Sequence, residues 1–364
     1  MSLAEAAADT GMTGPGSVQQ SATSPRAVGT GNGTLRFSFV IANYNYGRYV
    51  SRAIESALEQ DWPSVEVVVI DDGSNDNSVE VISGFGDRIT AIFAENAGQR
   101  IANNRAFAAS SGDIVVFLDA DDVVDPGFAR AVASVWREGL SKVQVVMARV
   151  DGEERPLGSL VPALNGTPSP AQIRDWAMTT SEYPTPPGSG NAYARSFLET
   201  FFPIGPDEDS STDSTCLALA PLFGEIETIA RPLALYRIHG SNDSNLHAAP
   251  DRFGREVRRA YVRQASAERA CARHGRPLPE KDCIRRGRHL LQLRVASLRL
   301  APESHPPEAG GRLTLLVDAL RSLLPSGPES PGKRLLVSAW ALATLLAPGP
   351  LARALVYRRF ATGR

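Results

Sequence analysis

The sequence predicts an α/β fold with a mostly parallel sheet flanked by helices, followed by a helical C-terminal extension. Short apolar runs alternate with segments of helical spacing over residues 36–150, which is the pattern of strands covered on both faces by helices. Most of residues 254–357 repeat apolar residues at helical spacing only. We therefore expect a disordered leader at 1–34, a catalytic-sized domain at 35–250 and a basic helical extension at 251–364.

The elements follow from the period of the apolar residues. Strands are expected at 37–41, 65–70, 89–93, 114–118 and 143–150, with helices at 49–59, 78–82, 101–109 and 126–136 between them. The Pro- and Gly-rich residues 155–190 predict a long loop, and a helix at 217–223 and strands at 226–230 and 233–238 follow it. The extension should hold helices at 254–298, 312–324 and 333–357, the last of them interrupted by two prolines.

Composition excludes several classes of protein. The 364 residues are 43% hydrophobic, so a sizeable core is available. Cys216, Cys271 and Cys283 have no paired spacing, which argues against disulfides and structural zinc and favours a reducing, cytoplasmic location. Residues 1–34 lack the apolar core of a secretory signal, and no apolar run of membrane-spanning length occurs before residue 330. No GxGxxG follows the first strand and no GxxxxGK[ST] occurs, so dinucleotide and P-loop sites are disfavoured.

Charge divides the chain into two parts. Residues 251–364 carry 22 Lys and Arg against 9 Asp and Glu, whereas residues 1–250 carry 16 against 31. The acidic part could hold a cation, and the basic part could meet an anionic surface.

Polar clusters follow three of the predicted strands. Asp119 and Asp121 come directly after the fourth strand, where a divalent cation would relieve their mutual repulsion; a solvated acidic turn is the alternative. Asp71 and Asp72 end the second strand, either as a turn and helix cap or as acceptors for a base or ribose. Tyr44, after the first strand, can stack on a base. Because ligands of parallel sheets bind beyond the carboxyl ends of strands, these clusters together predict a nucleotide site.

Five motifs in order resemble the family 2 glycosyltransferases, which have a GT-A fold. They are Val40-Ile41-Ala42-Asn43-Tyr44-Asn45, Val69-Ile70-Asp71-Asp72-Gly73-Ser74, Glu95-Asn96-Ala97-Gly98, Ala102-Asn103-Asn104 and Phe117-Leu118-Asp119-Ala120-Asp121-Asp122. The later Tyr236-Arg237-Ile238-His239-Gly240 is similar to the YRxH stretch that closes the domain in many members. The resemblance covers about residues 36–245, and Asn103 departs from it because an Arg is common there.

The resemblance implies an inverting transfer of a hexose from a nucleotide sugar, with UDP as the expected nucleotide and Mn²⁺ or Mg²⁺ as cofactor. Carried onto this chain, the residues implied to bind the nucleotide sugar are Ala42, Tyr44, Asp72, Gly98, Asn104 and Asp119. Asp121 would ligate the metal that bridges the diphosphate. His239 is either a further metal or diphosphate ligand or a plain hydrogen-bonded residue.

The catalytic base is sought among Asp207, Glu208, Asp209 and Asp213. The family has an Asp at the start of a helix after the acceptor loop, and Asp213 opens an apolar helix at the matching place. Its alternative role is a helix N-cap. The run 207–209 is interpreted as a solvated loop, and Gly188-Ser189-Gly190-Asn191 as either an acceptor-side loop or a plain turn.

The extension carries no motif. Leu335–Leu346 is apolar on all sides but too short to span a bilayer, so it should pack on the catalytic domain or lie in a membrane interface beside Lys333, Arg334, Arg353, Arg358 and Arg359. Peripheral contact with an anionic inner membrane face is favoured.

Taken together, these expectations describe a metal-dependent glycosyltransferase with a carbohydrate or lipid-linked acceptor, in bacterial polysaccharide or glycan assembly, with no nucleic-acid partner. The alternatives are a non-catalytic nucleotide-sugar-binding or scaffold protein, and a nucleotidyltransferase.

Overall fold

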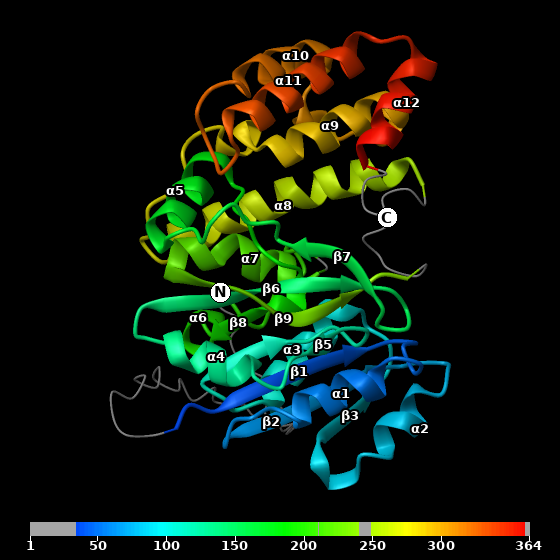
Figure 1. Cartoon of the computed structure of the whole chain (residues 1–364), viewed down its shortest axis with the longest axis vertical. Coiled ribbons are helices and arrows are strands. Elements are labelled where there is room, and N and C mark those ends of the chain that lie inside the picture. The colour runs from blue at the N-terminus through cyan, green and yellow to red at the C-terminus, as the bar shows by residue number, and fades with distance from the viewer. Residues whose placement is uncertain (1–33, 210, 240–248, 361–364) are drawn as a thin grey trace, which may run out of the picture.

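A nine-stranded mixed sheet forms the centre of the molecule, and helices cover both of its faces (Figure 1). The computed structural model describes residues 34–209, 211–239 and 249–360. The strand order is β3-β2-β1-β4-β8-β6-β9-β5, with β7 paired to β6. The mostly parallel sheet and the helical C-terminal region confirm the predicted fold class. The expected disordered leader falls, up to residue 33, outside the described residues.

The strands divide into a parallel half and a mixed half. They are β1 (Phe37–Asn43), β2 (Val65–Asp72), β3 (Thr90–Ala94), β4 (Ile114–Phe117), β5 (Val123–Val124), β6 (Leu140–Val150), β7 (Pro156–Val161), β8 (Asn191–Ala194) and β9 (Glu225–Arg237). β1 pairs in parallel with β2 and β4, whereas β8 runs antiparallel to both β4 and β6. The carboxyl ends of β1, β2 and β4 therefore share one edge, where the polar clusters begin.

The helices alternate with the strands and then continue alone. They are α1 (Val50–Leu58), α2 (Ser78–Ser83), α3 (Gln99–Ala109), α4 (Phe128–Val135), α5 (Pro170–Thr180), α6 (Arg195–Leu198), α7 (Thr212–Phe223), α8 (Asp251–Arg273), α9 (Arg288–Leu300), α10 (Arg312–Arg321), α11 (Pro331–Leu346) and α12 (Gly349–Phe360).

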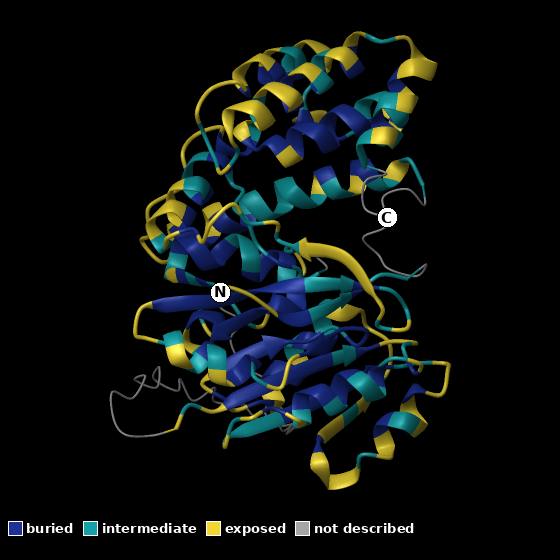
Figure 2. Cartoon of the chain, viewed as in Figure 1, coloured by how far each residue is buried: buried dark blue, intermediate teal, exposed yellow. Residues whose placement is uncertain are grey.

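Alternate residues of the inner strands belong to two different cores. Phe39 and Ile41 of β1 lie in one cluster with α1 and α4, while Val40 lies in the other with α3 and α7. Because successive strand side chains point to opposite faces, a strand covered on both faces must be apolar throughout. That is why the strands read as unbroken apolar runs, and Figure 2 shows them as buried.

The predicted loop at 155–190 is wrong, because it contains the strand β7 and the helix α5. α5 begins with a capping box in which Ser169 accepts the N–H of Gln172 and the Gln172 side chain accepts the N–H of Ser169, with Pro170 in the first turn. The high Pro and Gly content concealed this start signal. The two strands predicted at 226–230 and 233–238 form one strand, β9, whose register against β6 shifts near Pro232. β5, β8 and α6 were not predicted.

The helical extension joins the sheet domain through α8. Ala267, Ala270 and Cys271 of α8 share a core with Leu219 of α7, whereas Phe253 at its other end packs with α9 and α12. The predicted helix at 254–298 is therefore two helices, α8 and α9. No helix among the described residues is long and apolar enough to cross a membrane.

The N-terminus of α9 is capped from the sheet domain. The carboxylate of Glu182 accepts the backbone N–H groups of His289 (3.1 Å) and Leu290 (2.7 Å). These groups belong to the first turn of a helix, where no intrahelical acceptor exists, so the carboxylate stabilises α9. A methyl group on Gly287 would lie 2.5 Å from Glu182 Oε1, and this close approach requires glycine.

Candidate active site

The turn after β2 is organised by Asp71. Its carboxylate accepts the Nδ2 of Asn43 (2.8 Å) and both the N–H (2.9 Å) and the hydroxyl (2.6 Å) of Ser74. The Ser74 hydroxyl in turn accepts the N–H of Asn45 (2.8 Å). These bonds join the ends of β1 and β2 and hold Tyr44 between them, with 44% of its surface exposed. Tyr44 is thus presented on a rigid turn where a flat ring can stack on it.

Asp72 holds the segment that leads into α3. Its two carboxylate oxygens accept the N–H groups of Ala97 (3.0 Å) and Gly98 (2.8 Å). Gly98 has a φ of 86°, a conformation that glycine adopts without strain, and α3 starts at the next residue. The structure therefore brings Asp72 and Gly98 together, and each Asp72 oxygen keeps a further lone pair for a ligand.

The two asparagines of α3 face different partners. Asn104 donates to the carbonyl of Ile204 (3.0 Å) and accepts its N–H (2.9 Å), so its amide is committed to the chain between α6 and α7. Asn103 lines a narrow cavity of about 10 Å³ with Ala42 and Asp119 and donates to Thr212 Oγ1 (3.0 Å). Asn103 therefore lines the cavity beside Asp119, whereas the amide of Asn104, which was expected to contact the donor, holds the chain at Ile204.

Three carboxylates follow β4, and one of them has a structural role. Asp122 is buried, accepts the hydroxyl of Ser189 (2.6 Å) and accepts the N–H of Arg237 (3.0 Å). Ser189 also accepts the N–H of Asp119 (3.0 Å). Asp122 consequently ties together the end of β4, the Gly188–Asn191 segment and the end of β9. The sequence motif predicted roles for Asp119 and Asp121 but not this structural role of Asp122.

Asp121 meets His239. The Nε2 of His239 lies 2.9 Å from Asp121 Oδ2. The imidazole stacks on the ring of Tyr49 at a centroid distance of 5.0 Å and meets Tyr46 edge-on. The guanidinium of Arg237 donates to the Asp121 carbonyl (2.7 Å). It also lies over the ring of Tyr49, 5.0 Å from the ring centroid. Asp121 and His239, the two residues expected to bind metal, are therefore neighbours, and two tyrosine rings pack against His239.

Asp213 lies on the first turn of α7 but is not its N-cap. The helix begins at Thr212 after the N-cap residue Ser211, whose hydroxyl contacts the Asp213 carboxylate. Asp213 lines the same narrow cavity as Asp119. Gly188 lies between them, because a methyl group there would be 3.3 Å from Asp119 Oδ2 and 3.6 Å from Asp213 Cβ. The structure thus brings the candidate base to the carboxylate cluster.

The prediction of a solvated loop at 207–209 is wrong for Asp209. Asp209 is buried, and its carboxylate contacts the guanidinium groups of Arg259 (3.1 Å) and Arg263 (3.5 Å) of α8. Glu208 pairs with Arg269 (2.9 Å), and Asp207 is exposed. The acidic run is an anchor for the extension, and its basic partners are more than 45 residues away in the sequence.

The carboxylates repel one another. Burial, followed by the charges of Asp122, Asp121 and Asp213, raises the pKa of Asp119 well above its ordinary value. Burial and the charge of Asp121 likewise raise the pKa of Asp122. Among the described residues, no three His, Cys, Asp or Glu side chains converge into a closed metal site. Asp121 and His239 are two adjacent candidate ligands beside an acidic cluster, and such a set fits a divalent cation whose coordination is completed by oxygens of a bound phosphate group.

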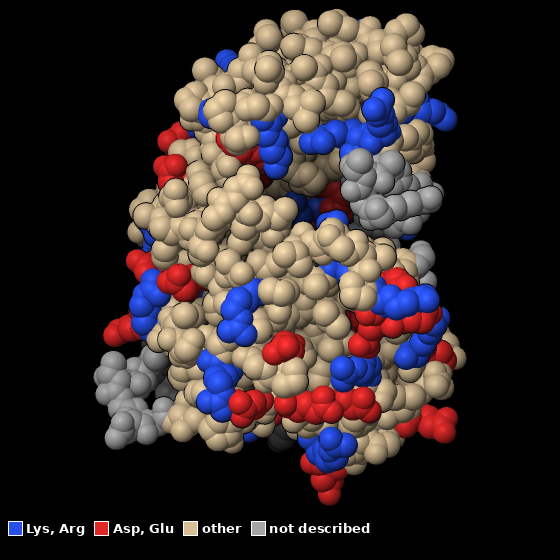
Figure 3. All heavy atoms as spheres, viewed as in Figure 1, with Lys and Arg blue, Asp and Glu red and all other residues tan. Residues whose placement is uncertain are grey.

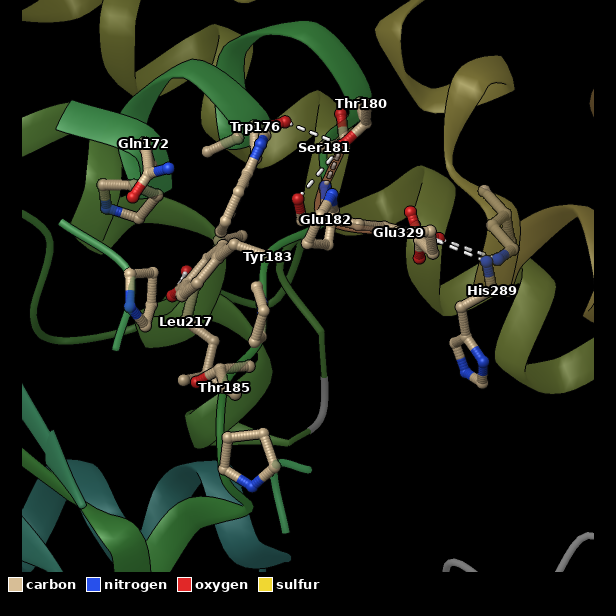
Figure 4. Close-up of a pocket in the computed structure, with 18 of the residues that line it drawn as sticks. Gln172, Trp176, Thr180, Ser181, Glu182, Tyr183, Thr185, Leu217, His289 and Glu329 are labelled. Carbon is tan, nitrogen blue, oxygen red and sulfur yellow. Dashed lines mark hydrogen bonds between the residues drawn. The ribbon is translucent and has the colours of Figure 1, made fainter. Parts of the chain in front are cut away.

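A cavity of about 870 Å³ lies behind α7, between the sheet domain and the extension. Ser214 and Leu217, on the same helix as Asp213, line it together with Trp176 and Tyr183. Figure 4 shows Tyr183 and Leu217 on one side and His289 on the other. Adjacent residues of α7 therefore line two cavities: Asp213 lines the small acidic one, and Ser214 lines the large one that has Trp176 and Tyr183 in its wall.

Lys142 of β6 is buried beneath that aromatic wall. Its Nζ donates to Tyr183 Oη (3.2 Å), Thr185 Oγ1 (2.9 Å) and Asn191 Oδ1 (2.9 Å). Burial lowers the pKa of Lys142 well below its ordinary value, because the charged form loses its water. Lys142 fixes the segment between the large cavity and Gly188. No motif predicted it.

Comparison with known proteins identifies the family of this chain. Residues 38–202 match the model of "Glycosyl transferase family 2". An uncharacterized glycosyltransferase of Nostoc is 39% identical over 57% of this chain and 66% of its own length. The uncharacterized glycosyltransferase YibD of Escherichia coli is 37% identical over 26% of this chain, and the matched part is 28% of that protein. This chain belongs to glycosyl transferase family 2.

A solved structure supports the GT-A-like fold. Residues 1–349 of S. aureus TarS, in complex with UDP-GlcNAc, align over 88% of this chain and 92% of that one, with a TM-score of 0.51 and 16% identity. At this identity the likeness concerns the fold alone.

Proposed function

We propose that this protein transfers a sugar from a nucleoside diphosphate sugar to an acceptor hydroxyl, with inversion, and that UDP-sugars are its donors. The observation that carries the proposal is the position of Gly188 between Asp119 and Asp213. It leaves one small space bordered by a donor-side carboxylate and a carboxylate on a separate helix. A single displacement needs this pair, because one group orients the sugar and the other takes the acceptor proton.

In the proposed donor complex, Tyr44 stacks on the base, and Asp72 accepts from the base or ribose with its remaining lone pairs. Asp119 orients the sugar beside Ala42. Asp121 and His239 would hold Mn²⁺ or Mg²⁺, which neutralises charge on the departing diphosphate. The structural bonds of Asp71 and Asp122 keep these groups in place without touching the donor.

In the proposed transfer, Asp213 accepts the proton of the acceptor hydroxyl. The hydroxyl oxygen forms a bond to the anomeric carbon on the face opposite the phosphate. The bond from that carbon to the phosphate oxygen breaks, and the nucleoside diphosphate leaves with the electron pair. Water can take the place of the acceptor, so donor hydrolysis reports the same chemistry.

The acceptor is proposed to occupy the large cavity. Aromatic walls such as Trp176 and Tyr183 suit the apolar faces of sugars or a lipid chain, and Ser214 connects the cavity to the helix that carries Asp213. A Trp176→Ala variant should keep donor hydrolysis and lose transfer to the acceptor. An equal loss of donor hydrolysis and of transfer would mean that the acceptor does not bind in this cavity.

The test of the proposed function is hydrolysis of a panel of UDP- and GDP-sugars with Mn²⁺. Asp213→Asn should bind donor as the wild type does but release nucleoside diphosphate about 10²–10⁴-fold more slowly. Asp207→Asn is the matched control, since Asp207 is exposed on the preceding loop. A wild-type rate in Asp213→Asn would refute the base. Donor binding without any turnover in the wild type would favour the non-catalytic alternative, and release of inorganic diphosphate would favour a nucleotidyltransferase.

A further inference from the structure

The outer surface of the extension is unusually apolar. Of the fifteen large apolar residues that are exposed among the described residues, nine lie between residues 313 and 351. We call them the leucine face: Leu313, Val317, Leu320, Leu323, Leu324, Leu335, Leu336, Leu346 and Leu351. Soluble surfaces scatter such residues singly, and a concentration of this kind marks a surface that something covers.

The leucine face follows from two helices that are apolar on both sides. On α10, Leu315 and Ala319 are buried against α9 and α11, while Leu313 and Leu320 point outward and Leu313 is 77% exposed. On α11, Val337, Ala341 and Leu345 are buried in the same cluster. The run Leu335–Leu346 thus packs within the extension, not on the catalytic domain, and its other side stays exposed.

Basic residues outnumber acidic ones along the segment that carries the leucine face. Residues 312–360 contain seven Lys and Arg and two acidic residues. Both acidic residues are committed to ion pairs: Asp318 with Arg285 (2.8 Å) and Arg294 (3.0 Å), and Glu329 with Arg288 (3.0 Å). Figure 3 shows the upper end of the visible face almost without charge and basic groups gathered below it.

We propose that the leucine face docks on an anionic lipid surface, with α10 and α11 lying in the headgroup region. The apolar side chains would enter the boundary of the acyl chains, and the basic residues around them would meet lipid phosphates. A second copy of the chain is the less suitable occupant, because a two-fold contact would bring equal positive charge together. The inference is independent of the proposed catalytic chemistry.

Flotation of the full chain with vesicles tests the proposal. Vesicles of phosphatidylcholine with about 30% phosphatidylglycerol should bind the protein, and pure phosphatidylcholine vesicles should bind it far less. The anionic share of about a third is chosen to resemble a cytoplasmic leaflet. The double variant Leu335→Glu with Leu336→Glu, at positions 62% and 60% exposed, should reduce binding by at least about tenfold. The matched control is Leu157→Glu with Leu160→Glu on β7, where two exposed leucines lie outside the leucine face. Both variants should keep the circular dichroism of the wild type, since no buried group changes.

A second pair of variants tests the charge. Arg353→Gln with Arg358→Gln should weaken binding to the anionic vesicles, and salt should weaken that of the wild type, because surface attraction is screened. Equal binding to neutral and anionic vesicles, or unchanged binding by the double glutamate variant, would overturn the proposal. A dimer in sedimentation without lipid that the double glutamate variant dissociates would also overturn it, in favour of a copy of this chain as the occupant.

Discussion

The Nε2 of His239 lies 2.9 Å from the Oδ2 of Asp121, although 118 residues separate them in the chain. The end of β9 and the turn after β4 meet here because Asp122 accepts the backbone N–H of Arg237. If these two side chains share a divalent cation, both must release their mutual contact to the metal.

Asp121→Ala and His239→Ala should therefore each weaken Mn²⁺-dependent donor binding by at least about tenfold, as loss of groups around a metal commonly does. Calorimetric titration of UDP-sugar with and without Mn²⁺ measures this. Asp125→Ala is the control, since its exposed carboxylate only accepts the nearby N–H of Gly127. An unchanged Mn²⁺ effect in Asp121→Ala would remove that residue from the ligand set.

Asp209→Asn should lower stability while leaving donor binding intact. The buried carboxylate faces two arginines of α8, so its loss leaves their charge without its partner at a cost of about 2 kcal/mol. Urea unfolding of the variant against Asp207→Asn measures the difference. Equal stability of the two variants would mean that Arg259 is satisfied by Glu256 alone, 2.9 Å away.

Gly188→Ala should slow turnover with little effect on stability. The added methyl group would make a tight contact of 3.3 Å with Asp119 Oδ2 and an ordinary one of 3.6 Å with Asp213 Cβ. A small shift of the Asp119 carboxylate relieves the first contact, so the free energy of unfolding should change by about 1 kcal/mol or less. The methyl group nevertheless narrows the gap between Asp119 and Asp213, where the acceptor hydroxyl is proposed to meet the sugar. Gly205→Ala, where a methyl group meets open space, is the control for donor hydrolysis. A wild-type rate in Gly188→Ala would place the reacting sugar elsewhere.

Lys142 should make stability rise with pH. The pKa of Lys142 is lowered in the folded state. Between that lowered pKa and about 10.5, the unfolded chain therefore binds more protons than the folded chain, and unfolding becomes less favourable as pH increases. Lys142→Met should lessen the rise measured by urea unfolding between pH 7 and 9.5. Lys281→Met, at an exposed lysine, should not. The same slope in Lys142→Met and the wild type would assign the pH dependence to other groups.

Much of the fold, and the meeting of the polar clusters at one sheet edge, could be predicted because the signals are local. The apolar runs that form β1, β2 and β4 lead into Asn43, Asp71 and Asp119. These residues come together because the three strands are parallel and end at the same edge of the sheet. The burial of Asp209 could not be predicted in this way, because its partners lie on α8.

The different partners of Asn103 and Asn104 show a second limit. Which of two adjacent helix residues faces the site depends on the phase of α3. Gly98, whose N–H is bonded to Asp72, is the residue before the first turn of α3. Sequence spacing gives the helix but not its rotation, and rotation by one residue moves a side chain by about 100° around a helix of 3.6 residues per turn.

The capping of α9 by Glu182 bears on how members of such a family can exchange parts. A carboxylate from the sheet domain caps the first turn of α9 in the extension, and a methyl group on Gly287 would clash with that carboxylate. The extension is therefore not a self-sufficient module. A chimera that joins the first 250 residues to a foreign C-terminal segment should express poorly unless residues 180–183 are replaced with it, because the grafted helix would begin with unsatisfied N–H groups and Glu182 would face an unmatched surface. Recombination among such proteins should accordingly keep the segment around Glu182 together with the start of α9, although the two are far apart in the sequence.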